Sequence, residues 1–165
     1  MKKQGFTLIE LMVVIVIMGI LAAVAVPKLF GMIAKSKASE VGPAAGTYVK
    51  LQQAFVSETG TDYGNFAIIG YAAPGQAGKT TNFTYTDEGS YSGTTNTAAL
   101  TSAVKNAWQA AANVKLNDCA IGKKWYVKVS KASSGNAADA VAFAASLEDE
   151  TNCQQLTPTF DKIGK

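Results

Sequence analysis

The sequence predicts an α+β fold, in which a long N-terminal α-helix packs on a small antiparallel β-sheet. The helix is expected to have a transmembrane half, residues 6–27, and an amphipathic half, residues 28–58. Three observations predict this arrangement: an uncharged apolar run near the N-terminus, apolar residues at helical spacing after it, and two alternating segments near the C-terminus. The remaining residues, 59–165, are expected to form a globular head, and a chain of 165 residues can bury a core of its own.

Composition excludes several functions. The net charge is +3, every cation is a lysine, and two of these, Lys2 and Lys3, lie in the first five residues. The chain has no arginine, the residue best suited to phosphate and base contacts, so no direct nucleic-acid partner is predicted. It also has no histidine, which removes Ser-His and Cys-His nucleophilic systems and the commonest metal ligand. We therefore do not expect an enzyme.

The N-terminal apolar run is long enough to cross a bilayer. Phe6 to Val26 covers 21 residues, or about 31 Å as a helix, which matches a hydrocarbon core. A secretory signal peptide is the alternative, because it also starts with basic residues and could be cleaved near Ala25. Its apolar core is usually shorter, however, and here the small residues lead into Pro27.

Glu10 is an acid inside this apolar stretch. A lone carboxylate near lipid costs a few kcal/mol, about 3 on insertion scales, and usually marks a function. It could lie near the headgroups, or be protonated, and have no role. It could instead pair with a cation, such as the free N-terminal amine of a neighbouring copy. The residue alone leaves both alternatives open.

The segment Gly5-Phe6-Thr7-Leu8-Ile9-Glu10, after a short lysine-containing leader, resembles the cleavage and assembly motif of type IV prepilins and the related pseudopilins. The likeness is strong over residues 1 to about 35 and fades beyond. It implies that a prepilin peptidase cuts between Gly5 and Phe6, and that the new amino group of Phe6 is methylated. It further implies that Glu10 neutralises the Phe6 ammonium of an adjacent subunit, and that the chain has the type IV pilin fold.

The second half of the helix is predicted from an apolar stripe near a 3.6-residue period. The stripe consists of Val41, Ala44, Ala45, Tyr48, Leu51 and Phe55. Gly19, Pro27 and the Gly42-Pro43 pair could bend the helix or divide it into two or three shorter ones. The resemblance favours one long, gently curved helix, with Gly19 to Pro27 able to unwind in an assembled filament.

The head is expected to begin where Gly60 ends the helix. A long glycine-containing stretch follows, in which Phe66–Ile69 and Phe83–Tyr85 are candidate strands within a surface loop. Residues Asn96–Val114 are predicted as a short helix, because Leu100, Val104, Trp108 and Ala111 fall on one helical face.

The clearest strands come last. Trp125–Ser130 and Ala140–Leu147 alternate in apolar character, and a turn-rich link at 131–138 predicts that they pair as an antiparallel hairpin. Cys119 precedes this hairpin and Cys153 follows it. In an exported domain a lone pair of cysteines predicts a disulfide, whereas a cytosolic chain would hold two separate buried thiols. The resemblance also implies a disulfide-bounded C-terminal segment.

No cofactor or metal site is predicted. Residues Gly75–Thr80 end like a phosphate-binding loop, but the required earlier glycine is Ala73, and no clean strand and helix frame it. Calcium is an alternative at the acidic residues Glu148, Asp149, Glu150 and Asp161. A solvated acidic turn is favoured there, because the ligand spacing of a calcium loop is missing.

The predicted function is therefore structural: a major pilin of a type IV pilus, with a leader at residues 1–5. Its expected partners are further copies in a homopolymer, prepilin peptidase, an inner-membrane assembly machinery and, before assembly, the lipid bilayer. Its expected location is the bacterial inner membrane, as a single-pass chain with the C-terminus outside the cytoplasm, and then the extracellular pilus. The alternatives are a type II secretion pseudopilin, or a membrane-anchored minor pilin with an adhesive role.

Overall fold

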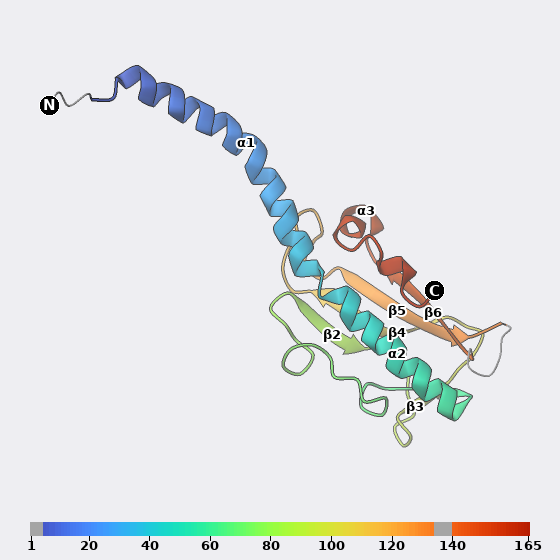
Figure 1. Ribbon diagram of the computed structural model, residues 1–165. Helices are drawn as coiled ribbons and strands as arrows, with labels where there is room; N and C mark the ends of the chain where they lie inside the picture. The colour runs from blue at the N-terminus through green and yellow to red at the C-terminus, as the bar shows by residue number, and fades with distance from the viewer. Residues whose placement is uncertain (1–4, 134–139) are drawn as a thin grey trace.

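The computed structural model describes residues 5–133 and 140–165. The leader residues 1–4 and positions 134–138 of the expected hairpin link therefore lie outside the described residues. Two consecutive helices, α1 (Leu8–Ala38) and α2 (Val41–Thr59), lead into a mainly β head. Figure 1 shows α1 projecting away from the head while α2 lies across it. This is the predicted α+β arrangement of a long N-terminal helical region on antiparallel sheet, and it is consistent with the pilin fold.

Helix α1 is apolar over most of its length and lies in solvent rather than in the core. Its large apolar side chains are exposed from Leu8 to Ile33, and only Ala34 and Ala38 are buried. The helical part of the chain starting at Leu8 is long and apolar enough to cross a membrane, by length and composition. Pro27 lies inside α1 without ending it, and α1 bends gently along its length (Figure 1).

The helical region is interrupted once, at Ser39 and Glu40. The expected second bend at Gly42-Pro43 is therefore placed two residues too late. Pro43 explains the shift, because a proline has no N–H with which to bond the carbonyl four residues earlier. That carbonyl belongs to Ser39, and the break falls there. The helix resumes as Ala44 donates its N–H to the Glu40 carbonyl at 3.3 Å.

Helix α2 buries one face against the head, as its apolar stripe predicts. Val41, Ala45 and Tyr48 are fully buried, whereas Leu51 and Phe55 of the expected stripe are only half-buried. The helix ends at Gly60, as predicted, in a left-handed conformation with φ 77° that favours glycine. The Gly60 N–H donates to the Val56 carbonyl at 2.7 Å and closes the last turn.

The main sheet has four antiparallel strands in the order β2-β4-β5-β6. These are β2 (Phe83–Asp87), β4 (Lys105–Ala112), β5 (Lys124–Lys131) and β6 (Val141–Leu147). The predicted hairpin is confirmed as β5 and β6, which pair from Trp125 and Leu147 to Lys131 and Val141. The predicted strand at Phe83–Tyr85 is confirmed within β2.

Two predictions for the head are wrong. Asn96–Val114 is not a helix: it contains β3 (Thr97–Ala99), which pairs with β1 (Asp62–Gly64), and β4. Strand β4 is buried on both faces from Ala107 to Ala110, and its alanines on both faces hide the alternation of a strand. The expected strand at Phe66–Ile69 is a turn, in which the Asn65 side chain accepts the Ile68 N–H at 3.0 Å.

The core lies between α2 and the inner face of the sheet. Trp108 and Trp125 are its largest members, both fully buried. The Trp108 ring lies 6.5 Å from the Tyr48 ring of α2, and 6.4 Å from Phe160 in the C-terminal segment. That segment consists of α3 (Glu150–Cys153) and two 3₁₀ turns, η2 (Gln154–Leu156) and η3 (Phe160–Lys162).

The outer edge of β2 is occupied by the chain that precedes it. The Tyr85 N–H donates to the Gly78 carbonyl at 2.7 Å, and the Thr80 N–H donates to the Phe83 carbonyl at 2.8 Å. Gly78 lies in a tight turn over Gln76–Lys79, and Thr80 follows that turn directly. Backbone groups of this edge are therefore bonded within the chain.

Candidate functional site

The N-terminal segment starts as exposed chain outside any helix or strand. Gly5 and Phe6 precede α1, and the Phe6 side chain is 90% exposed. Thr7 caps the helix: its side-chain oxygen accepts the Glu10 N–H at 3.3 Å. The bond between Gly5 and Phe6 is thus held in no helix or strand of the described chain.

Glu10 completes this cap from the other side. Its Oε2 accepts the Thr7 N–H at 2.8 Å and the Thr7 hydroxyl at 2.8 Å. Such a reciprocal capping box satisfies amide groups that a helix start otherwise leaves unpaired. Glu10 remains exposed. The carboxylate is therefore aimed back toward the chain start, four residues from Phe6, and remains open to a cation from outside the chain.

One face of α1 forms a shallow apolar groove of about 370 Å³. It is lined by Ile9, Met12, Val13, Val16 and Ile17. These positions recur at intervals of three and four residues, so they form one stripe along the helix. Grooves of this kind accept the ridge of another helix.

The expected flexible positions fall in two places. Gly19 and Pro27 lie within continuous helix, and a Cβ added at Gly19 would meet nothing within 4 Å. Gly42 and Pro43 lie in the first turn of α2, just after the break. All four positions are helical in this isolated chain, and their unwinding in a filament stays a prediction.

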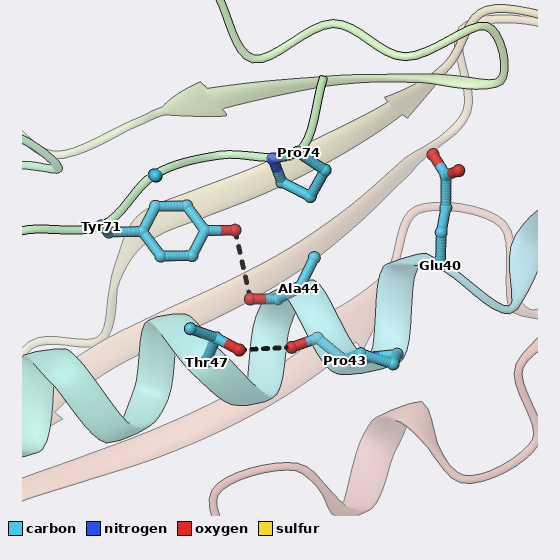
Figure 2. A pocket seen from close by; sticks show the side chains of 7 residues that line it. Glu40, Pro43, Ala44, Thr47, Tyr71 and Pro74 are labelled. Carbon is cyan, nitrogen blue, oxygen red and sulfur yellow. Dashed lines mark hydrogen bonds between the residues drawn. The ribbon is translucent and has the colours of Figure 1, made fainter. Parts of the chain in front are cut away.

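Glu40, at the break between the helices, accepts hydrogen bonds from β2 and from the chain just before it. Its Oε1 accepts the Thr80 hydroxyl at 2.6 Å and the Tyr85 hydroxyl at 3.0 Å. Burial and the neighbouring carboxylate raise the pKa of the Tyr85 hydroxyl well above its usual range, so that it stays a donor. Beside Glu40 is an open pocket of about 330 Å³. Figure 2 shows Tyr71, Pro74 and Glu40 around it, with the Tyr71 hydroxyl bonded to the Ala44 carbonyl.

Glu40 is not among the site residues predicted from the sequence. Its partners are 40 and 45 residues away in the chain, so no local pattern could reveal them. The one available signal is its position, as an acid directly before the apolar stripe of α2.

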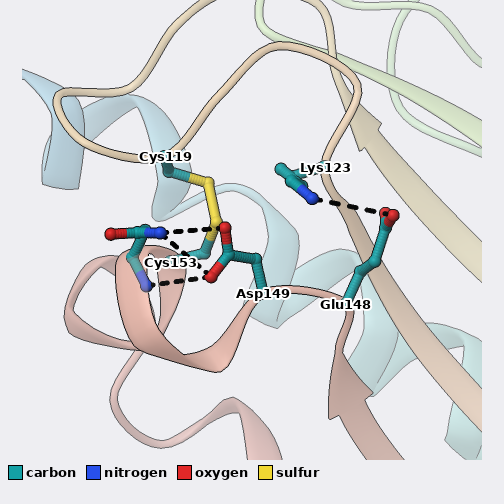
Figure 3. A network of polar contacts seen from close by, with 6 residues as sticks. Cys119, Lys123, Glu148, Asp149 and Cys153 are labelled. Carbon is teal, nitrogen blue, oxygen red and sulfur yellow. Dashed lines mark hydrogen bonds and ion pairs between the residues drawn. A yellow bond between two sulfur atoms is a disulfide. The ribbon is translucent and has the colours of Figure 1, made fainter.

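The predicted disulfide is confirmed. Cys119 and Cys153 are bonded, with their Cα atoms 4.9 Å apart, and both are buried. Closing a loop of 34 residues stabilises a fold by about 4 kcal/mol on the loop-entropy model. The bond ties α3, and through it the C-terminal segment, to the chain ahead of β5 (Figure 3).

The acidic residues near this bond have local partners. Asp149 caps α3, with its Oδ1 accepting the Asn152 N–H at 3.1 Å, and Glu148 lies 3.8 Å from Lys123 (Figure 3). The hydrogen bonds from Asn152 lower the pKa of Asp149. Over residues 5–133 and 140–165, no three His, Cys, Asp or Glu side chains form a group that could hold a metal. The described residues therefore provide no group of side chains that supports the calcium alternative.

The fold and the N-terminal segment define a class: an α+β head on a helix that is long and apolar enough to cross a membrane. Residues 1–26 match the family described as the prokaryotic N-terminal methylation motif. The chain thus carries the N-terminal methylation motif of prokaryotic type IV pilins, and the resemblance is confirmed over this segment.

Three proteins are similar to part of this chain. The type IV major pilin protein PilA of Myxococcus xanthus is 44% identical over 72 residues, covering 43% of this chain and 32% of the relative. The fimbrial protein EcpC of Eikenella corrodens is 42% identical over 71 residues, covering 43% and 46%. A type IV major fimbrial protein FimA of Dichelobacter nodosus is 52% identical over 44 residues, covering 27% and 28%.

The chain thus spans less than half the length of these curated relatives. No solved structure matches the chain.

Proposed function

We propose that this chain is the structural subunit, a major pilin, of a type IV pilus. The observation that carries the proposal is the combination of a methylation motif at residues 1–26 with an apolar helix left exposed by a head that has its own core. A soluble protein buries such a surface. The names of the similar proteins, type IV major pilin and major fimbrial protein, support the same function.

The first step is processing by a prepilin peptidase between Gly5 and Phe6, followed by methylation of the Phe6 amine. The exposed, non-helical chain around this bond supports the step, because a protease needs extended backbone. Gly5 has no side chain to obstruct approach to its carbonyl.

Before assembly, the chain lies in the bacterial inner membrane with residues 6–27 across the bilayer and the head outside the cytoplasm. The length of the exposed apolar helix supports this location. A disulfide in the head fits an oxidising compartment beyond the membrane. The disulfide also favours the pilus over the secretion alternative.

Assembly, through an inner-membrane machinery, then packs α1 of each subunit against α1 of others in a homopolymer. The apolar groove over Ile9–Ile17 supplies a surface for this packing. Glu10 pairs with the Phe6 ammonium of a neighbour, because a charge in an apolar bundle is tolerated only when it is paired. Docking subunits are thereby held in one register.

Purified surface filaments test the proposal. We expect mass spectrometry to find one main subunit that begins at methylated Phe6 and is two hydrogens light because of the Cys119–Cys153 bond. Glu10→Ala should abolish or shorten filaments, whereas the control Glu58→Ala, on the exposed side of α2, should leave them unchanged. An intact Met1 terminus in filaments would contradict the processing step, and normal filaments from Glu10→Ala would contradict the pairing.

A further inference from the structure

The exposed apolar surface of α1 is longer than a hydrocarbon core. It runs from Phe6 to Ile33, which is 28 residues or about 42 Å at helical rise. A hydrocarbon core is about 30 Å thick, and a bilayer with its headgroups is about 40–45 Å. If Phe6 to Val26 fills the core, the headgroup layer beyond it is about 5–7 Å thick and holds residues 28–31. Lys35 and Lys37 then lie just outside this layer, and their long side chains can extend back toward the phosphates.

This last part of α1 has the composition of a helix at a membrane interface. Besides Glu10, the charged residues of α1 are Lys28, Lys35 and Lys37, all within its last eleven residues. Between and beside them lie four exposed apolar side chains: Leu29, Phe30, Met32 and Ile33. Long cations beside apolar surface can bury their stems and extend their ammonium groups to the phosphate layer.

The three lysines lie on two sides of the helix, and Lys37 is on the same side as Phe30, seven residues earlier. Lys28 and Lys35 are seven residues apart, so they share one side of the helix, and Lys37 lies on another side. The side toward the head is formed by small residues, with Ala34 and Ala38 buried against the C-terminal segment. Among the residues that the structure describes, Lys123 and Glu148 form the one ion pair. Lys28, Lys35 and Lys37 are therefore free to bind an external anion.

We propose that residues 28–37, here termed the juxtamembrane collar, bind anionic phospholipid headgroups and seat the head on the membrane before assembly. The inference rests on the proposed membrane-held precursor and adds its lipid partner. Three lysines against an anionic surface each contribute an attraction of about 1 kcal/mol, while the apolar face enters the interface. The collar therefore fixes the depth of α1.

Fluorescence in nanodiscs tests the collar. The full chain is inserted, one copy per disc, into equal parts of phosphatidylcholine and phosphatidylglycerol, with Phe30→Trp as reporter and the unsubstituted chain as blank. Bromine quencher is placed near the headgroup end of the acyl chains of one lipid or the other. We expect quenching to be about twofold stronger with brominated phosphatidylglycerol, because the lysines enrich the anionic lipid.

Matched substitutions separate the collar from general charge. Lys28→Gln, Lys35→Gln and Lys37→Gln together should make quenching by the two lipids equal. Lys50→Gln, Lys105→Gln and Lys115→Gln together remove the same charge from exposed positions outside α1 and should leave the preference intact. Equal quenching in the parent reporter, a preference that survives the collar substitutions, or no quenching by either lipid would each overturn the proposal.

A second reporter, Val16→Trp, is read with bromine placed near the terminal methyl end of the acyl chains, at the bilayer centre, and distinguishes this failure from a failure of the proposed function. If Val16→Trp is quenched by both lipids and Phe30→Trp shows no preference, the helix spans the bilayer and only the collar is wrong. If Val16→Trp is not quenched at all, the chain is not in the membrane, and the membrane-held precursor itself is wrong.

Discussion

The indole N–H of Trp108 donates a hydrogen bond to the Tyr71 hydroxyl at 3.0 Å, in the middle of the buried core. The same hydroxyl donates to the Ala44 carbonyl of α2 at 3.1 Å. Tyr71 comes from the loop region between α2 and β2, Trp108 from the central strand. One phenol thus joins the sheet, the loop and the helix, which lie far apart in the sequence.

Tyr71→Phe is expected to destabilise the chain by about 1–3 kcal/mol, because it leaves the buried Trp108 N–H without its partner. Urea unfolding in detergent micelles, followed by tryptophan fluorescence, measures the change. The control is Tyr126→Phe, which removes a hydroxyl from the opposite, half-buried face of β5. A loss no larger for Tyr71→Phe than for Tyr126→Phe would show that the bond adds no net stability.

Glu40→Ala is expected to loosen the edge of the head beside β2. Glu40 holds the Thr80 hydroxyl, and the oxygen of that hydroxyl accepts the N–H groups of Asn82 and Phe83 at 3.2 and 2.9 Å. Losing charge-assisted bonds should cost about 1–2 kcal/mol. Hydrogen exchange at Asn82 and Phe83 should become faster, whereas Glu58→Ala should leave it unchanged. Unchanged hydrogen exchange at Asn82 and Phe83 in Glu40→Ala would mean that the turn before β2 is stable without Glu40.

Ala77→Asn is expected to stabilise the head. Ala77 and Gly78 are the central residues of the turn over Gln76–Lys79, and both have positive φ, 50° and 75°. This is the geometry of a type I′ turn, for which Asn-Gly is favoured and alanine is strained. We expect a gain of about 0.5–1 kcal/mol in unfolding free energy. Ala103→Asn, at an exposed position without positive φ, is the control and should bring no gain.

Two aspartates should titrate on opposite sides of their ordinary pKa of about 3.9. Burial raises the pKa of Asp87, although its carboxylate accepts N–H groups from Phe66 and Gly89. The pKa of Asp149 is lowered by hydrogen bonds from Asn152. Carbon-detected NMR titration of the side-chain carboxyls measures both midpoints, and a midpoint for Asp87 below that of Asp149 would contradict the structure.

The sign of each contribution to stability follows from these shifts. The raised pKa means that Asp87 binds its proton more tightly in the folded chain than in the unfolded one. Its contribution to stability is therefore fully present below about pH 3.9 and is lost as the pH rises through the raised pKa. Asp149 contributes stability above about pH 3.9 that is lost as the pH falls through its lowered pKa. Asp87→Asn and Asp149→Asn should each remove one of these pH dependences from the unfolding curves.

Local patterns predicted the parts of the fold that depend on local chemistry. The alternation of Trp125, Val127 and Val129 predicted β5, and the single glycine at position 60 predicted the end of α2. At both places one physical requirement dominates, so the neighbouring residues suffice. The disulfide, between cysteines 34 residues apart, was predicted instead from a lone cysteine pair in an exported domain.

Other parts depend on partners that are distant in the sequence. Half of the residues of strand β4 are alanine, and alanine favours helices, yet pairing with β2 and β5 determines its structure. The break at Ser39 follows from Pro43, but a proline alone leaves open whether a helix bends or ends. Of the candidate site, Gly5, Phe6 and Glu10 were found by their motif, while Glu40 required the fold.

The occupied outer edge of β2 has a consequence for a chain that is to polymerise. A sheet edge with free N–H and C=O groups can recruit a strand from another molecule, which leads to disordered aggregation. Here Tyr85 and Thr80 already bond within the chain along that edge. Heads that lie close together therefore cannot pair strand to strand along this edge. Subunits are left to associate through their helices, where they can be added in order.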